Sequence, residues 1–431
     1  MPNSDEQLVA QYGDQGKGLI ARYLGIKNFE KKTVSHIFSP YKKTLVSKAL
    51  TEVIKGTEDV EVYEERVSFD LDWYGQTIGA SYEFLEVGRD NKEELMTKGY
   101  RFLLKDEIRL AVSISEDFYG FIHLDISYAK KHTVNSILFL DSIIKYMKNN
   151  NFYLNEKIDA NGKFLTLENI GFDSLILPES QKKAIKVGAL DFFKKKELYE
   201  KNGIAYKRGI IMTGQPGTGK THACKVLMNA ATSTFIWITA DVLTHKGDIK
   251  HIFDMARELA PVILVIEDAD DYLELEGSVD TLKTQLDGMD AVSGIVTILC
   301  TNYPERLPKS LIDRPSRFDD ILIFELPDED LRLSLLNKFS ELMNIENRDY
   351  IFKEIAKETK GLTGAHLKEI IIYSLLLASD DERDIITEDD LAKALLKVKN
   401  TKEIAIHGLK DIDVKCLLKE LGHVKKNKES D

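Results

Sequence analysis

Five short apolar runs in the second part of the chain constrain its fold more than any other feature. They lie at residues 210–213, 234–239, 262–266, 295–300 and 321–324. Stretches with helical spacing separate them, and short apolar strands that alternate with helices are typical of a parallel sheet covered on both faces. The sequence therefore predicts an α/β core that begins near residue 166.

The regions on either side of this core have a different character. Before it, the sequence predicts an α+β module, with helices near residues 19–24, 41–54 and 136–148 and strands at 67–73, 110–114 and 121–128. Behind it, apolar spacing predicts a small helical lid, with helices at 329–343, 365–379 and 387–398. We therefore expect an N-terminal recognition or assembly domain at 1–165, an α/β domain at 166–328, a lid at 329–405 and a tail at 406–431.

A glycine-rich motif follows the first of the five runs. It fits the pattern G-x-x-x-x-G-K-[ST] and consists of Gly214, Gln215, Pro216, Gly217, Thr218, Gly219, Lys220 and Thr221. Glycines at such a turn let backbone N–H groups face phosphate oxygens, and the N-terminus of the next helix adds positive potential. In this pattern Lys220 contacts the β- and γ-phosphates, and the Thr221 hydroxyl ligates Mg²⁺. We therefore predict a P-loop NTPase core that binds ATP with Mg²⁺, and we include the adjoining His222 in the nucleotide site.

Two acids follow the third run, at the sheet edge where ligands of open α/β sheets bind. The five apolar residues end at Glu267, so we assign Glu267 to Mg²⁺ and Asp268 to activation of the attacking water. In the alternative register Asp268 holds the metal ion and Ala269 stands in the catalytic place, which predicts a poor hydrolase. A third interpretation is that the acids only solvate the end of the strand.

Asn302 ends the next strand, and two arginines follow it on one short loop. The Asn302 amide can donate to the γ-phosphate and accept from water, so we predict a sensor role, with a simple turn residue as the alternative. The guanidinium groups of Arg314 and Arg317 suit phosphate oxygens and stabilise charge in a transition state. An arginine supplied by another subunit would couple hydrolysis to assembly. The alternative is a surface ion pair with Asp313 or Asp319.

The order of these motifs resembles the AAA ATPase family over about residues 166–400. The stretch 199–209, the inverted order Glu267-Asp268, the sequence Leu286-Asp-Gly288 and the arginine loop are most similar to one branch. That branch contains the mitochondrial AAA ATPase that moves a folded iron–sulfur (Rieske) protein during assembly of respiratory complex III, and the inverted acids are a trait of it.

The resemblance implies an ATP-hydrolysing ring of six or seven identical subunits. In such a ring Arg314 and Arg317 act on the nucleotide of the neighbouring subunit, as catalytic residues together with Lys220, Asp268 and Asn302. The resemblance also places two lid residues, Gly364 and Ala365, beside the nucleotide.

Two departures from the family concern the client. The mitochondrial members have an N-terminal membrane-spanning helix, and no apolar stretch of this chain is long enough to predict one. Many AAA threading machines carry an aromatic residue in a pore loop, whereas the corresponding stretch here, residues 241–248, contains no Phe, Tyr or Trp. We therefore expect chaperone-like remodelling or movement of a protein client rather than processive unfolding.

The composition bears on partners and compartment. The formal net charge of −12 disfavours a nucleic-acid partner. The three cysteines lack metal-ligand spacing and are expected as small core or surface residues, which fits a reducing cytoplasm. The apolar stretches are too short to cross a bilayer, so we expect a cytoplasmic protein without membrane insertion. A nucleic-acid-directed AAA ATPase and a nucleotide-switched assembly scaffold are the alternatives to a remodelling enzyme.

Overall fold

The chain forms two compact units. The computed structural model describes residues 20–21, 23–27, 30–65, 67–71, 77–105, 107–245, 247–288, 294–312 and 317–407. The first unit contains residues 1–166, 232–238 and 251–262, and the second contains residues 167–231, 239–250 and 263–431. Within the described ranges, no helix combines the length and the apolar character needed to cross a membrane.

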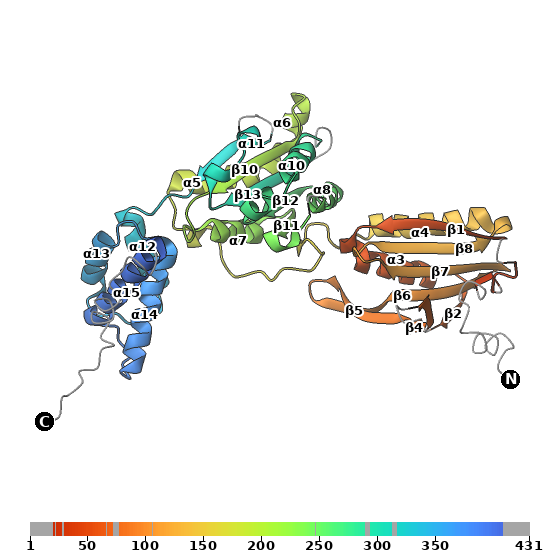
Figure 1. Ribbon diagram of the computed structural model, residues 1–431, viewed down its shortest axis with the longest axis horizontal. Coiled ribbons are helices and arrows are strands. Elements are labelled where there is room, and N and C mark those ends of the chain that lie inside the picture. Colours follow the sequence, from red (N-terminus) through yellow and green to blue (C-terminus); the bar gives the residue numbers. More distant parts are fainter. Residues whose placement is uncertain are drawn as a thin grey trace. The chain divides into compact units, whose positions relative to one another are not determined.

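An antiparallel sheet is the main element of the first unit (Figure 1). Its strand order is β1-β8-β7-β6-β2, and β5 pairs with β6. The strands are β1 (Lys31–Phe38), β2 (Glu61–Glu65), β5 (Ser81–Gly88), β6 (Asn91–Lys105), β7 (Ile108–Glu116) and β8 (Ile122–Ala129), and a separate pair consists of β3 (Val67–Leu71) and β4 (Thr77–Gly79). Alternation lets β8 bury one face, because Ile122, Leu124 and Ile126 are buried whereas His123 and Asp125 between them are half-buried.

Two helices pack against each other in this unit, α3 (Lys43–Lys55) and α4 (Thr133–Asn149). The buried residues Leu45, Ala49 and Leu50 lie on one side of α3 because of their helical spacing. α3 also contacts β6 and α4 contacts β8, so these helices cover the sheet. The predicted α+β module is thus confirmed, while the helix expected near residues 19–24 falls partly outside the described residues.

All five predicted core strands belong to one sheet with the order β14-β10-β13-β12-β11-β9. The strands are β9 (Lys157–Asp159), β10 (Lys207–Thr213), β11 (Thr234–Ile238), β12 (Val262–Ile266), β13 (Ile295–Thr301) and β14 (Asp320–Ile323). β10 runs parallel to both β13 and β14. Every residue of β12 and β13 is buried, which explains why these strands are apolar along their whole length.

Helices connect the strands of this sheet (Figure 1). They are α5 (Glu179–Ile185), α6 (Lys196–Lys201), α7 (Lys220–Ala230), α8 (Asp248–Glu258), α9 (Ala269–Leu273), α10 (Ser278–Asp287) and α11 (Lys309–Ile312). Strands that alternate with helices and a phosphate loop between β10 and α7 make this an α/β fold of the P-loop NTPase type, as predicted.

The lid is a bundle of four helices: α12 (Glu329–Phe339), α13 (Arg348–Glu358), α14 (Gly364–Asp380) and α15 (Glu388–His407). Asp328 caps α12 by accepting from the Leu331 N–H at 2.8 Å. Thr363 and His366 form a reciprocal cap at the start of α14. The predicted helical lid is confirmed, but the sequence predicted three of these helices and missed α13.

Candidate nucleotide-binding site

The phosphate loop, residues 214–219, joins the end of β10 to the start of α7. Gly217 and Gly219 have positive φ values of 80° and 107°, which glycine adopts without strain. A Cβ at Gly217 would lie 2.7 Å from the Cβ of Ala365, so the loop needs glycine there to approach the lid. A Cβ at Gly219 would meet no atom within 4 Å, so open space lies beside this residue.

Lys220, the first residue of α7, uses its ammonium group to connect the loop to the next strand. Its Nζ donates to the carbonyl oxygens of Gly214 at 2.6 Å and Gln215 at 3.2 Å, and to Oδ1 of Asn302 at 2.7 Å. The residue is only 8% exposed, and this burial lowers the pKa of Lys220. The predicted lysine and the predicted sensor asparagine are therefore in direct contact.

The carboxylates after β12 lie at the same edge of the sheet. Oδ1 of Asp268 accepts from Nδ2 of Asn302 at 3.1 Å, so the Asn302 amide connects Lys220 to Asp268. Glu267 is buried, Asp268 is exposed, and both line the same cavity. Ala269, which the alternative register places in the catalytic position, is a fully buried residue at the start of α9.

A further acid, Asp270, holds the end of β13, and no role was predicted for it. One carboxylate oxygen accepts from the Asn302 backbone N–H at 3.1 Å, and the other accepts from the Thr301 hydroxyl. Asp270 is buried, so these bonds fix the backbone that carries the Asn302 amide. In the sequence, Asp270 is simply an acid two residues after Asp268, and this position does not distinguish a buried, hydrogen-bonded acid from one that is exposed to solvent.

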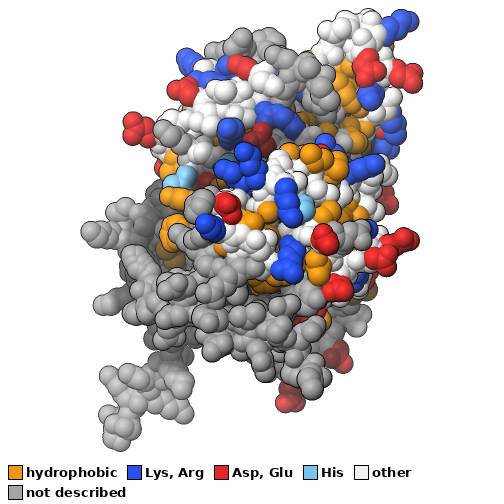
Figure 2. Space-filling view, turned by 90° about the vertical axis from the view of Figure 1, so that its right-hand side faces the viewer, with side chains coloured by type: hydrophobic (Ala, Val, Ile, Leu, Met, Phe, Trp, Pro, Cys, Tyr) orange, Lys and Arg blue, Asp and Glu red, His pale blue; other side chains and the backbone are white. Residues whose placement is uncertain are grey.

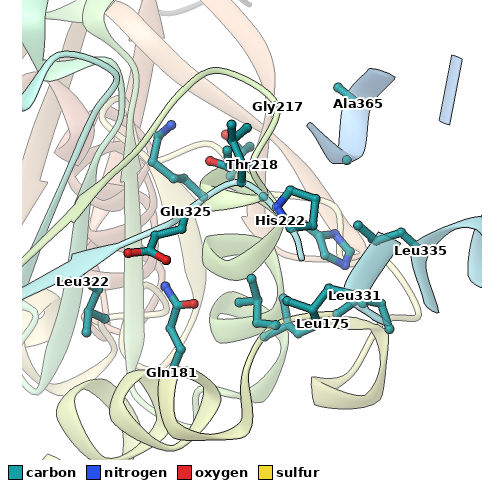
Figure 3. Close-up of a pocket in the computed structure, with 18 of the residues that line it drawn as sticks. Leu175, Gln181, Gly217, Thr218, His222, Leu322, Glu325, Leu331, Leu335 and Ala365 are labelled. Atoms are coloured by element: carbon teal, nitrogen blue, oxygen red, sulfur yellow. The ribbon is translucent and has the colours of Figure 1, made fainter. Parts of the chain in front are cut away.

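A cavity of about 880 Å³ lies beside the phosphate loop. Figure 3 shows Leu175, His222, Leu331 and Leu335 on one side of it, with the loop residues Gly217 and Thr218 above them. His222 is held by Ser174, whose Oγ lies 3.0 Å from Nε2 of the ring. An apolar wall beside a phosphate loop suits a nucleotide base, because binding pockets combine apolar surface with a few polar groups.

Sequence analysis placed His222 in the nucleotide site, and this residue lines the cavity, but the leucines of the wall were missed. The available signal for the wall was the apolar stretch 175–177, which stands directly before Pro178 and belongs to no strand. The lid contributes Leu331 and Leu335 to this wall. These leucines have the spacing of ordinary core residues of a helix, so nothing in the sequence indicated that they line a cavity.

Comparison with known proteins agrees with this geometry. Residues 210–326 match the family model described as "ATPase family associated with various cellular activities (AAA)". These residues are therefore similar to an AAA ATPase domain, and we call them the AAA domain below.

Curated relatives extend the similarity beyond the AAA domain. The chain is similar to the proteasome-activating nucleotidases of Methanocaldococcus jannaschii, with 35% identity over 236 residues, and of Methanopyrus kandleri, with 34% identity over 228 residues. These matches cover 51% and 49% of this chain and 54% and 52% of the relatives. The similar protein of Thermococcus onnurineus has 32% identity over 234 residues, which cover 49% of this chain and 58% of the relative. The chain therefore matches about half the length of these relatives.

The lid touches the phosphate loop of the AAA domain through two residues that the resemblance had placed beside the nucleotide. The Ala365 N–H donates to the Gly217 carbonyl at 3.2 Å. A Cβ at Gly364 would lie 3.4 Å from the same oxygen, so this residue also lies against the loop. Both Gly364 and Ala365 line the cavity.

The structure describes only one of the two arginines that were predicted to act on a neighbouring subunit. Arg314 lies outside the described residues, as does Asp313. Arg317 is 7% exposed and pairs with both carboxylate oxygens of Asp287, at 2.9 Å and 2.8 Å, and its third contact is the Ser310 carbonyl. Arg317 does not line the cavity of its own chain, and among the described residues its ion pair is with Asp287 rather than with Asp319, one of the two acids named in the alternative interpretation.

Proposed function

We propose that this chain hydrolyses ATP with Mg²⁺ and couples the hydrolysis to remodelling or translocation of a protein client. The observation that carries the proposal is the hydrogen-bonded series from Lys220 through Asn302 to Asp268. These groups come from three separate elements and meet beside one cavity. Phosphoryl transfer depends mainly on such positioning and on neutralisation of charge.

In this proposal each residue has one task. The backbone of the phosphate loop and Lys220 bind the β- and γ-phosphates. Thr221 and Glu267 would hold Mg²⁺, because both line the cavity and present the hard oxygen donors that this ion prefers. The ion would neutralise developing charge on the phosphate oxygens. Asp268 polarises the attacking water, and Asn302 orients it against the γ-phosphate.

We further propose that the active form is a ring of six or seven subunits, in which Arg314 and Arg317 complete the site of the neighbouring subunit. The described residues that line the cavity include Lys220, Lys338 and Lys368 but no arginine. A guanidinium group for the transition state must therefore come from elsewhere if it is used. The Asp287 carboxylate holds the Arg317 group in one orientation.

The client is proposed to be a protein. The similar archaeal proteins are named proteasome-activating nucleotidases, and the inverted Glu267-Asp268 order is also similar to the mitochondrial assembly branch. On the face drawn in Figure 2, Lys and Arg side chains lie at separate points among hydrophobic and acidic ones. Such a mixed surface suits a protein partner better than a phosphate backbone, which requires clustered positive charge.

The test is steady-state ATP hydrolysis by the purified chain, alone and in mixtures of variants. We expect Asp268→Asn and Arg317→Ala each to lose activity and an equal mixture to regain part of it, because a mixed ring contains sites with an intact acid and an intact neighbouring arginine. Arg306→Ala is a matched control, since Arg306 pairs with Glu274 on the surface. If Arg317 acts only through its ion pair, Asp287→Ala will cause the same loss and mixing will restore nothing.

The nature of the client is tested with the Asp268→Asn chain, which should hold ATP and release its client slowly. ATP-dependent recovery of one protein species supports the proposal. Recovery of nucleic acid, or ATPase stimulation by DNA or RNA, would overturn it in favour of a nucleic-acid-directed enzyme.

A further inference from the structure

Two thiols and one carboxylate converge behind the nucleotide cavity. Cys224 lies one turn after Lys220 on α7, and Cys300 lies two residues before Asn302, on β13. Their sulfur atoms are 3.6 Å apart although the residues are 76 positions apart in the sequence. Glu267, at the end of β12, completes a group whose ligand atoms all lie within 4.8 Å of one another. The three residues are 0%, 2% and 9% exposed for Cys224, Cys300 and Glu267.

The separations match those of metal ligands. A tetrahedral Zn²⁺ with Zn–S bonds of about 2.3 Å places two sulfur ligands about 3.8 Å apart. The observed separation of 3.6 Å therefore needs almost no adjustment to admit an ion between the sulfurs. A disulfide would need a separation of about 2.05 Å, which requires a much larger movement of two packed elements.

We propose that Cys224, Cys300 and Glu267 form an inhibitory site for a thiophilic divalent cation of the Zn²⁺ type. Binding converts both thiols to thiolates and releases two protons, so that two thiolates and one carboxylate surround the ion. Thiolates prefer a soft cation such as Zn²⁺ to Mg²⁺, so this site is chemically distinct from the magnesium site.

Glu267 couples the two sites. The inhibitory part of the inference rests on the proposed function, in which Glu267 serves Mg²⁺. An ion that occupies Glu267 removes this carboxylate from the magnesium site and lowers ATP hydrolysis. Cys300 and Glu267 both line the cavity, so an ion from solvent reaches them there, and a bound nucleotide should hinder its entry.

A direct binding experiment tests the site without reference to activity. The full-length chain is titrated with Cd²⁺ in the presence of a phosphine reductant, and the thiolate-to-metal charge-transfer absorbance is followed. We expect one ion per chain for the wild type and for Cys416→Ala, which removes the third thiol. Cys224→Ala and Cys300→Ala should each weaken binding at least about 100-fold, since even loss of a residue that only supports a metal ligand costs 10–100-fold.

The second readout is inhibition of ATP hydrolysis by Zn²⁺ at saturating Mg²⁺. Inhibition should appear in the wild type and in Cys416→Ala, should largely disappear in Cys224→Ala and Cys300→Ala, and should slow when ATP is added before Zn²⁺. The inference is overturned if Cys416→Ala abolishes Cd²⁺ binding, or if Cys224→Ala and Cys300→Ala, each shown to be folded by circular dichroism, both bind Cd²⁺ as the wild type does. Cd²⁺ binding without any ATPase activity would instead refute the proposed function and leave the site standing.

Discussion

The two six-stranded sheets of the described residues differ in how the polar residues around them are arranged. In the parallel sheet, Lys220, Asp268 and Asn302 follow different strands and are joined by hydrogen bonds. In the first unit, polar residues form small local groups, such as Thr33 of β1 with Ser127 of β8 at 3.1 Å, and Lys48 of α3 with Glu93 of β6 at 2.7 Å and Glu52 at 3.2 Å. The first arrangement makes one site, and the second makes separate local contacts.

Strand direction explains this difference. Parallel strands all present their carboxyl ends at one edge, so residues that follow successive strands gather there. Antiparallel strands present alternate ends at each edge, so residues that follow successive strands are dispersed. Chemistry is therefore expected in the parallel sheet, and assembly or recognition in the antiparallel one.

The largest expected effect is the loss of Lys220. Lys220→Ala should lower ATP hydrolysis at least about 1,000-fold and weaken ATP binding, because the ammonium group is the main positive charge at the phosphate loop. Lys48→Ala is the control, since Lys48 is a half-buried lysine on helix α3 of the first unit and is ion-paired with Glu93 of β6. An equal loss of hydrolysis in a folded Lys48→Ala chain would break the distinction between the two sheets.

The next largest effect separates the two acids at the end of β12. Asp268→Asn should lower kcat about 100- to 1,000-fold with little change in KM for ATP, because it removes the group that polarises water. Glu267→Gln should mainly raise the Mg²⁺ concentration that is needed for half-maximal activity. The reverse pattern would support the alternative register, in which Asp268 holds the metal ion.

A smaller effect is expected at Asp270, which positions Asn302 without reaching the cavity that holds the phosphate loop. Asp270→Asn should lower kcat about tenfold and leave KM for ATP nearly unchanged, because residues that support a functional group contribute through its orientation. Asp271→Asn, at the exposed neighbouring position, should have no effect. A rise in KM without a fall in kcat would show that Asp270 serves binding rather than orientation.

The smallest effect concerns an ion pair of the lid that should act on stability alone. Arg383 and the Thr387 N–H hold the pKa of Asp390 at about 2, below its ordinary value of 3.8. Because the pKa of Asp390 is lower in the folded chain than in the unfolded chain, its ionised carboxylate stabilises the fold at pH values above the unfolded pKa. This stabilisation disappears as the pH falls from about 4 toward 2. Asp390→Asn should therefore lower the free energy of unfolding by about 1–2 kcal/mol at pH 7.

Thermal unfolding of wild type and Asp390→Asn at a series of pH values measures this effect. The difference between their Tm values should narrow as the solution becomes more acidic, and the ATPase rate at pH 7 should be the same for both. A large change in kcat would mean that the lid pair belongs to the nucleotide site.

The sequence predicted the parallel sheet well because its strands are buried on both faces. The expected run 262–266 coincides with β12, and the other four core strands were found within three residues of their ends. β6 was missed because its 15 residues mix Lys and Glu with apolar residues and include Gly99, so no clear alternation remains. α13 was missed because Asn347, with a φ of 44°, turns the chain just before the first residue of this helix.

The sequence predicted those residues of the candidate site that belong to a motif with a fixed backbone conformation. It did not predict the residues that reach the site only through the packing of distant segments. The phosphate loop and the acids after β12 follow from their sequence patterns. The role of Asp270 depends on the turn at Asp268, whose φ of 46° directs the chain into α9 and brings Asp270, the next acid in the sequence, to the backbone N–H of Asn302. Likewise, only the fold brings Arg317 to Asp287, 30 residues away in the sequence.

The bond from the Ala365 N–H to the Gly217 carbonyl makes the lid and the phosphate loop one mechanical linkage. A hydrogen bond weakens steeply when its angle or length departs from the preferred range. Any rotation of α14 must therefore pull this carbonyl along or break the bond. In the proposed function, a movement at the γ-phosphate would thus pass to the whole of α14 through one peptide group, without the movement of any side chain.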